Sequence, residues 1–259
     1  MSDRSFYSSV GLILGVAFAG LLIWECVVWL FDLPRALLPT PRDVVAAGIR
    51  ERVPLLRATF MTGIAALSGL IAAIVIGSLI SIVFSQSRRI RLAFFPYVVF
   101  LQTVPIVAIA PLLIIWSGYR FRTVVIVTVI ICLFPIVNNV TAGLLAIDRD
   151  LADLFRLYGA GRVKKLIRLQ IPTAVRYLML GAKTSSGLAV IGAIVAEFFV
   201  GNGSEYDGLG TLMTAWQGFL KTDALIAALF ASTLLGLLLF GAVQFVSATI
   251  LRRWTWTAA

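Results

Sequence analysis

Apolar residues along the chain fall into six long runs separated by polar connections. Each run holds about 18 residues or more with few charges, which is the length a helix needs to cross a hydrocarbon layer of about 30 Å. The runs are residues 8–31, 57–84, 92–116, 122–146, 177–200 and 224–251. The pattern predicts an all-α, polytopic membrane protein with six transmembrane helices in a single domain over residues 1–259.

Composition supports lipid as the solvent. Hydrophobic residues make up 60% of the chain and charged residues 13%, with a mean hydropathy of +1.00. The chain contains no histidine, which excludes His-based acid–base catalysis, Ser-His-Asp hydrolysis and His-metal sites. No run holds two acidic residues at catalytic spacing, so we expect no enzymatic activity, no metal and no cofactor.

The net charge of +10 is explained by the placement of Lys and Arg in the connections between membrane spans. Lys and Arg lie mostly between the apolar runs and are not interleaved with aromatic residues, so we expect contact with membrane lipid and not with nucleic acid. Inner connections of membrane proteins are enriched in Lys and Arg, and this enrichment is found here if the chain starts inside. We therefore expect a multi-pass protein of the bacterial cell (inner) membrane with both termini cytoplasmic.

The connection after the first run contains a helix start. Thr40 is placed to cap a helix, Pro41 suits its first turn, and Asp43 can complete a capping box. A short outer interfacial helix is expected to follow, with Val44 and Ile49 on its apolar face.

The connection between the fourth and fifth runs is far longer than a plain connector needs. We expect Asp150 to cap a helix that Gly159 and its neighbours end. The spacing i, i+3, i+4, i+7 predicts its apolar face, formed by Leu151, Leu154, Phe155 and Tyr158.

A second short amphipathic helix is expected next, with Val163 and Ile167 on one face and basic residues on the other, before Ile171 and Pro172 lead into the fifth run. Periodicity alone leaves two interpretations open. The segment 147–172 either lies on anionic lipid or docks against another protein.

The run 153–174, DLFRLYGAGRVKKLIRLQIPTA, resembles the EAA loop of binding-protein-dependent ABC importer permeases. That motif reads Glu-Ala-Ala, three residues, Gly, nine residues and an Ile-x-Leu-Pro ending. Gly159 takes the glycine, residues 153–155 take Glu-Ala-Ala as Asp-Leu-Phe, and Ile171 replaces the leucine before Pro172. In the family this loop is the coupling helix, seated in a cleft of the cytoplasmic ATPase. The resemblance implies coupling roles for Asp153, Leu154, Phe155, Arg156, Gly159, Ala160, Ile171 and Pro172.

Further segments resemble the nitrate, sulfonate, taurine and pyrimidine-precursor branch of these permeases. They are QTVPIVAIAPL at 102–112, IWSG at 115–118, FPIVNN at 134–139, AE at 196–197 and GLG at 208–210. The resemblance covers the chain from about residue 38 onward and implies a type I ABC importer permease.

The resemblance also implies partners: two ABC ATPase subunits, a second copy of the permease in a homodimer, and a periplasmic or lipid-anchored solute-binding protein. The chain has no GxxxxGK[ST] loop, so ATP is expected to bind to a separate chain. The alternative is a secondary transporter or channel without ATP coupling, which would need charge relays or an inverted repeat within the membrane.

Several polar residues in the spans are candidates for the translocation path. Prolines in the third run are expected to kink it and free backbone carbonyls, and polar side chains lie beside this kink and after Pro135 in the next run. They line a path or form interhelical hydrogen bonds. The candidates are Gln102, Thr103, Pro105, Asn138 and Asn139.

Glu197 completes the set of candidates, near the outer end of the fifth run. It serves either a polar cavity at an outer gate or an interfacial ion pair. Glu25 in the first run is expected at an interface, and the glycine-rich segment 201–210 is expected to form an outer gate or a docking rim for a binding protein.

Overall fold

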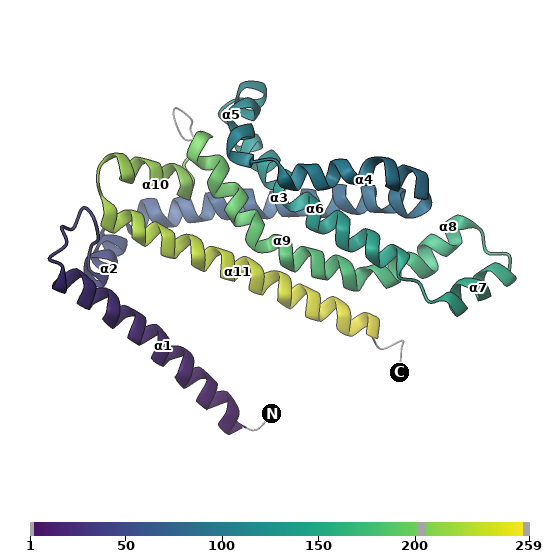
Figure 1. Cartoon of the computed structure of the whole chain (residues 1–259), viewed down its shortest axis with the longest axis horizontal. Helices are drawn as coiled ribbons and strands as arrows, with labels where there is room; N and C mark the ends of the chain where they lie inside the picture. Colours follow the sequence, from purple (N-terminus) through teal and green to yellow (C-terminus); the bar gives the residue numbers. More distant parts are fainter. Residues whose placement is uncertain (1–2, 201–205, 256–259) are drawn as a thin grey trace.

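The computed structural model describes residues 3–200 and 206–255, and every regular element in these ranges is a helix. Figure 1 shows an elongated bundle with short helices at both ends and with α1 inclined away from it. In chain order the elements are α1 (Asp3–Leu30), α2 (Pro41–Arg50), α3 (Arg52–Gln86), α4 (Arg88–Thr103), α5 (Ile106–Ser117), α6 (Phe121–Leu145), α7 (Arg149–Leu157), α8 (Arg162–Lys165), the π-helix η1 (Leu166–Gln170), α9 (Ile171–Val200), α10 (Leu209–Gly218) and α11 (Thr222–Thr255).

The centre of the bundle is formed by α3, α6 and α9, which pack against one another. Small side chains line this interface, and Ala65 and Ala73 of α3 and Ala189 and Ala193 of α9 are fully buried. In lipid, helices gain little from burying apolar surface, so close backbone approach across small residues supplies the packing.

Four helices in the described ranges are long and apolar enough to cross a membrane: α3, α6, the helix from Arg162 to Val200, and the helix from Thr222 to Arg252. The pair α4 and α5 adds a fifth crossing if it is counted as one bent span. α1 contributes the shorter apolar helix Gly15–Leu30. The predicted count of six crossings is compatible with this arrangement.

The predicted span 92–116 is two helices and not one kinked helix. The axes of α4 and α5 differ by 99°. Pro105 has no N–H to continue the ladder and holds Val104 in an extended conformation, with ψ of 127°. Pro96 and Pro111 lie inside α4 and α5 and do not end them.

The fifth span starts earlier than the predicted residue 177, because a continuous helix runs from Arg162 to Val200. The expected second short helix is therefore the beginning of this long helix. Pro172 cannot donate to the carbonyl four residues before it, and the wider π-turn η1 lies directly ahead of this proline. In that turn the Ile171 N–H donates to the Leu166 carbonyl oxygen, five residues earlier.

The pattern of apolar residues does not predict α10, which packs along α9 before α11 begins (Figure 1). Leu209, Met213 and Trp216 pack into a cluster with Ala58 of α3. Residues 201–205 of the expected gate or rim lie outside the described residues, and the end of that segment starts α10.

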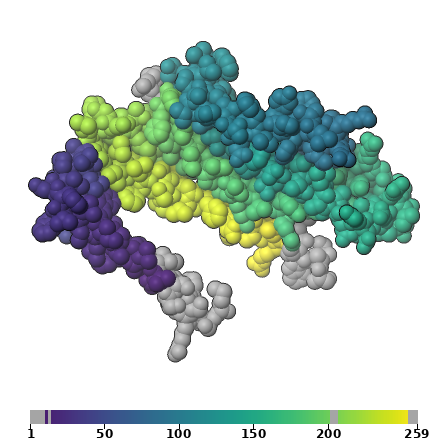
Figure 2. Space-filling view, in the orientation of Figure 1, coloured from purple at the N-terminus to yellow at the C-terminus, as the bar shows by residue number. Residues whose placement is uncertain are grey.

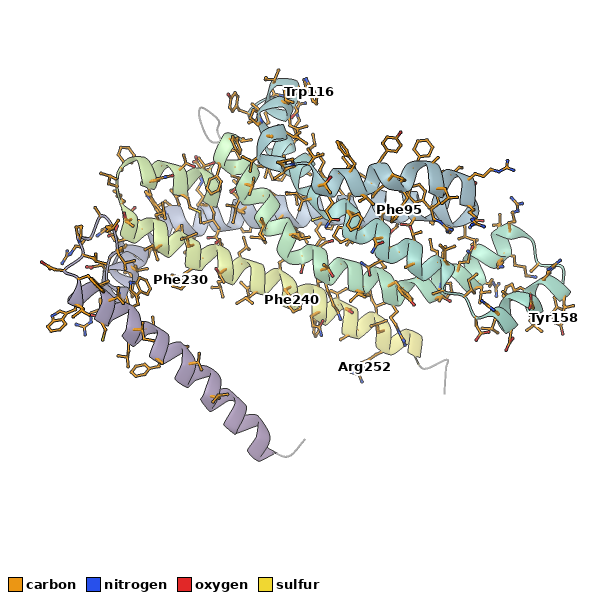
Figure 3. The ribbon with its side chains drawn as sticks, viewed as in Figure 1. Phe95, Trp116, Tyr158, Phe230, Phe240 and Arg252 are labelled. Carbon is orange, nitrogen blue, oxygen red and sulfur yellow. The ribbon has the colours of Figure 1, made fainter. Side chains whose placement is uncertain are left out.

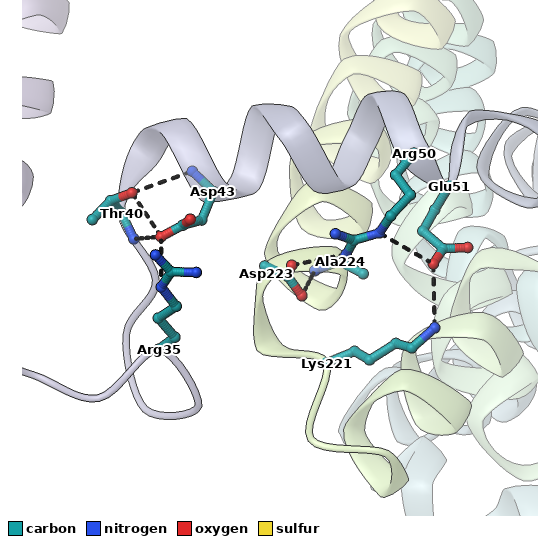
Figure 4. A network of polar contacts seen from close by, with 8 residues as sticks. All are labelled: Arg35, Thr40, Asp43, Arg50, Glu51, Lys221, Asp223 and Ala224. Carbon is teal, nitrogen blue, oxygen red and sulfur yellow. Dashed lines mark hydrogen bonds and ion pairs between the residues drawn. The ribbon is translucent and has the colours of Figure 1, made fainter.

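The predicted cap of α2 is confirmed. The Thr40 hydroxyl oxygen accepts from the Asp43 N–H at 3.2 Å, and Asp43 Oδ2 accepts from the Thr40 N–H at 3.2 Å (Figure 4). The side-chain hydrogen bond from Thr40, which outweighs the opposing effect of burial, holds the pKa of Asp43 below its usual range.

Ion pairs fix α2 against the start of α11. Arg50 Nη2 lies 3.0 Å from Asp223 Oδ2, and Lys221 Nζ lies 3.2 Å from Glu51 Oε1 (Figure 4). Both pairs join residues about 170 positions apart in the sequence. They define the end of the bundle opposite α7.

α1 is held to the bundle near its C-terminal end and inclines away from α11 along the rest of its length (Figures 1 and 2). Trp24 Nε1 donates to the Pro39 carbonyl at 3.1 Å, and the Trp24 ring stacks on Phe230 of α11. Glu25, which was expected at an interface, forms an ion pair with Arg42 at 3.9 Å.

Candidate functional site

The helix α7 begins beside Asp148, so the expected cap at Asp150 is wrong. Asp148 Oδ1 accepts from the N–H groups of Asp150 at 2.8 Å and Leu151 at 3.4 Å. Asp150 lies instead in the first turn, where its charge complements the positive end of the helix dipole.

The predicted glycine turn ends α7. Gly159 has a φ of +66°, a left-handed conformation that side chains with a Cβ rarely adopt. The Gly159 N–H donates to the Arg156 carbonyl at 3.0 Å and the Ala160 N–H donates to the Phe155 carbonyl at 2.9 Å, which is the Schellman pattern. This turn redirects the chain into α8.

The helix α7 has a largely uncovered apolar face, because none of its residues is buried. Leu154 is 46% exposed and Tyr158 just beyond the helix is 82% exposed. Figure 3 shows Tyr158 at the far end of the molecule from α2. Phe155 is half-buried, while Asp153 and Arg156 are exposed on the polar side.

The segment 147–172, called the coupling segment after the family loop that it resembles, is joined to the bundle through Gln170. This side chain is 6% exposed. Its Oε1 accepts from Gln86 Nε2 at 3.0 Å, and its Nε2 donates to the Leu144 carbonyl at 3.1 Å. Gln170 thus links the π-turn to the ends of α3 and α6, while Ile171 and Pro172 beside it are half-buried. The sequence analysis did not single out Gln170, although the motif ending contains it.

The candidate path residues on the third run lie at the break between α4 and α5. Gln102, Thr103 and Pro105 are exposed. A cavity of about 300 Å³ opens beside the break and is bounded by Gln102, by Pro135 of α6 and by Leu188 of α9. Gln102 and Pro135 are therefore brought together, as a path between these helices requires.

The two asparagines of α6 do not form the interhelical hydrogen bonds that were considered for them, within the part of the chain that the structure describes. Asn138 is exposed. Asn139 Nδ2 donates to the Pro135 carbonyl of its own helix at 2.8 Å. Their use in a path remains a prediction.

Glu197 lies apart from this group, close to the C-terminal end of α9. It is fully buried and forms no ion pair with the described residues. Its carboxylate accepts from the Thr62 hydroxyl at 2.9 Å, from the Tyr206 hydroxyl at 2.8 Å and from the Gly210 N–H at 2.8 Å. The expected interfacial ion pair is thus not what holds it.

Glu197 and Thr62 together cap α10 from other helices. The Leu209 N–H donates to the Thr62 hydroxyl oxygen at 2.8 Å, and the neighbouring Gly210 N–H donates to the Glu197 carboxylate. Two unpaired N–H groups of the first turn are thereby satisfied. A Cβ on Gly210 would lie 2.7 Å from the Cβ of Glu197, so glycine is needed for this approach.

Tyr206 closes the site from the loop before α10. Burial, followed by the charge of Glu197, raises the pKa of the Tyr206 phenol far above its usual range, so the phenol stays protonated and donates. The sequence analysis quoted the Ala-Glu pair and the Gly-Leu-Gly triplet separately. Nothing in the linear pattern showed that the two segments meet, or that Thr62 joins them.

These features define a class of protein: a helical membrane subunit with a broken helix beside a cavity that Gln102 lines, and with an amphipathic segment outside the bundle, as expected of a transport subunit. Residues 52–255 match the family of binding-protein-dependent transport system inner membrane components, and the chain belongs to this family. It is a permease subunit of an ABC importer and not an enzyme. Membership implies an ATPase and a substrate-binding protein as partners.

Named relatives agree with this assignment. The formylaminopyrimidine transport permease protein ThiX of Halalkalibacterium halodurans is 33% identical, over 86% of this chain and 88% of the relative. The riboflavin transport system permease protein RibX of Chloroflexus aurantiacus is 30% identical, over 85% and 81%. The putative aliphatic sulfonates transport permease protein SsuC of Escherichia coli is 33% identical, over 59% and 55%.

The geometry around Glu197 predicts a structural effect of its removal. Glu197→Ala leaves buried donors of Thr62, Tyr206 and Gly210 without acceptors, and each unpaired group costs about 1–3 kcal/mol. We expect a loss of stability of about 3 kcal/mol and faster hydrogen exchange at the first amides of α10, measured on the purified protein. Glu197→Gln keeps one acceptor and should lose less.

Glu25→Ala is the matched control, since Glu25 holds a partly exposed ion pair on α1. It should leave exchange in α10 unchanged. Unchanged exchange in Glu197→Ala would show that α10 is held by other contacts.

Proposed function

We propose that the coupling segment docks into a cleft of the ATPase and that two copies of the chain form the path for a small solute. The observation that carries this proposal is the uncovered apolar face of α7 at the tip of the helix that continues into α9. An amphipathic helix laid into a groove is a recurrent mode of protein recognition.

Charge favours docking over a position on anionic lipid. Helices that lie on such membranes are rich in Lys and Arg on their polar face. α7 instead carries Asp150 and Asp153 against Arg149 and Arg156, with the cap Asp148 ahead of them. Within α7 itself the acidic and basic residues balance, and the other basic residues of the segment lie on α8 and η1. The apolar face of α7 therefore lacks a predominantly basic polar face opposite it, and its apolar side chains need a partner.

Movement of the docked segment has a direct route to the spans. α8, η1 and α9 are one continuous helix, and the turn at Gly159 joins α7 to its start, so displacement of that start moves α9. Gln170 ties the same point to α3 and α6 through its two hydrogen bonds. ATP-driven closure of the ATPase pair can thereby reach all three central helices.

The orientation of the chain is part of the proposal. α7 and α8 must face the cytoplasm to meet an ATPase, which places α2 and α10 outside, where a solute-binding protein docks. α11 runs toward the α7 end of the bundle and α1 starts from that direction (Figure 1). Both termini are then cytoplasmic, as the distribution of Lys and Arg predicts.

The solute is proposed as a small sulfonate, nitrate or taurine-like anion or a pyrimidine precursor. The candidate path groups are neutral amides and hydroxyls of Gln102, Thr103, Asn138 and Asn139. Such groups can hydrogen-bond a sulfonate oxygen or a ring nitrogen equally well. The binding protein then makes the choice between these solutes.

Reconstitution tests the function and the solute together. The chain, its cognate ATPase and its binding protein are placed in liposomes, and uptake of taurine, nitrate and an aminopyrimidine is measured with and without ATP. We expect uptake of one of these solutes, dependent on both ATP and the binding protein. Uptake that needs no ATP would favour the secondary transporter or channel instead.

The docking face is tested by Leu154→Asp. A charge in the middle of an apolar contact should weaken ATPase binding by about tenfold or more, measured by copurification. Arg149→Gln is the control, because it changes the net charge by the same amount on the polar side of α7. Equal copurification of both variants would count against the proposed face.

The joint at Gln170 is tested by Gln170→Leu, which removes its hydrogen bonds while keeping a side chain of similar size. We expect ATPase binding and hydrolysis to persist, with about tenfold less solute taken up per ATP, because two buried hydrogen bonds of about 1 kcal/mol each are lost. Gln217→Leu on the exposed side of α10 should keep the normal ratio. A normal ratio in Gln170→Leu would exclude this residue from transmission.

A further inference from the structure

A cationic pocket lies between α9 and α11 in the half of the bundle next to the coupling segment. Its volume is about 360 Å³, at the lower end of the range of small-molecule sites. Arg176 and Lys183 line it from one face of α9, and Ser247 and Leu251 line it from α11. None of these residues belongs to the coupling face or to the candidate path.

The two cations of the pocket have no counter-charge from the described residues. No ion pair joins Arg176 or Lys183 to a carboxylate there. Lys183 is half-buried and lies about 10 Å further along the helix than Arg176, at 1.5 Å per residue. A charge at such a position is costly unless it finds a partner or reaches the membrane surface.

The direction of the lysine side chain makes the two charges converge. Side chains on a helix lean toward its N-terminus, and the N-terminal end of α9 adjoins the coupling segment. Lys183 therefore leans toward Arg176, and its four-carbon stem brings the ammonium toward the headgroup level. The pocket thus presents two positive groups to one bound anion.

Ser247 gives an independent sign of a missing ligand. It is fully buried, and its Oγ has no hydrogen-bond partner. A serine in a spanning helix normally donates to the carbonyl four residues earlier, as Thr249 of the same helix does. An unpaired hydroxyl beside two unpaired cations marks a site that lacks an acceptor.

The surroundings of the pocket identify the kind of anion. Apolar side chains form part of its lining, with the exposed Leu180 and the half-buried Met179 on α9 and the half-buried Leu251 on α11. Figure 3 shows Phe240 ahead of the pocket residues on α11 and Arg252 beyond them, so an apolar surface leads to a basic end. A ligand with a negative head and apolar tails matches this order, and basic pockets between spanning helices hold lipid headgroups.

We propose that Arg176, Lys183 and Ser247 bind the phosphate of an anionic phospholipid headgroup in the leaflet next to the coupling segment. The two cations neutralise the phosphate, and the serine hydroxyl donates to one of its oxygens. The bound lipid holds α9 and α11 together at the level where α9 leaves the membrane. The site does not depend on the solute or on the ATPase.

Native mass spectrometry of the purified full-length chain tests the proposal. The protein is equilibrated with equal amounts of phosphatidylglycerol and phosphatidylcholine, and the ratio of the two retained lipids is measured. We expect retention of phosphatidylglycerol over phosphatidylcholine, and a drop of about fivefold in this ratio for Arg176→Gln and for Lys183→Gln. Ser247→Ala should lower it about threefold.

Matched variants separate this site from general charge and from misfolding. Arg89→Gln removes an exposed basic residue in the first turn of α4 and should leave the ratio unchanged. Lys183→Arg keeps the charge and should retain phosphatidylglycerol. An equal loss in Arg89→Gln, or no preference in the unaltered protein, would overturn the site.

Two further outcomes would replace the lipid by another occupant. Displacement of phosphatidylglycerol by inorganic phosphate would identify a site for a soluble anion. A disulfide between two copies of Lys183→Cys would show that a second chain covers the pocket. Either result contradicts the lipid proposal, and neither affects the test of solute uptake.

Discussion

Hydrocarbon offers no hydrogen-bond partner to the backbone, and the rest of this structure depends on that constraint. A helix can be interrupted within the bundle only where another group satisfies the released N–H and C=O groups. At the start of α10 the hydroxyl of Thr62 and the carboxylate of Glu197 accept from Leu209 and Gly210. At the π-turn, the amide of Gln170 donates to the carbonyl at the end of α6. These three polar side chains therefore lie where helices begin, end or change pitch.

Much of the fold follows from local patterns. Long apolar runs located the spanning helices because a bilayer fixes the length they need, and the sequence Thr40-Pro41-x-Asp43 located α2 because a capping box involves only neighbouring residues. Gly159 located the end of α7 for the same reason. Each of these signals involves only residues that are close together in the sequence, so the sequence alone predicts the feature.

The remaining features depend on residues far apart in the chain. Glu197 and Thr62 are separated by 135 positions, and their joint role as a cap for α10 appears only once α3 and α9 are packed. The 99° bend at Pro105 is likewise larger than a proline alone requires, since Pro96 and Pro111 leave their helices intact. The hydrogen bond between Gln86 and Gln170 joins residues 84 positions apart. The motif ending, which contains Gln170, therefore could not predict this bond.

The unbroken helix from Arg162 to Val200 has 39 residues and a length of about 58 Å at 1.5 Å per residue. A bilayer core accommodates about 30 Å of this length, so a large part of the rod stands clear of the hydrocarbon. A rotation of about 5° about its C-terminal end displaces its N-terminal tip by about 5 Å, from the same rise per residue. A small change in the angle between packed helices thus corresponds to a displacement of several ångströms at the tip of this helix. Conversely, a displacement of several ångströms imposed at the tip changes the helix angle inside the bundle by only a few degrees.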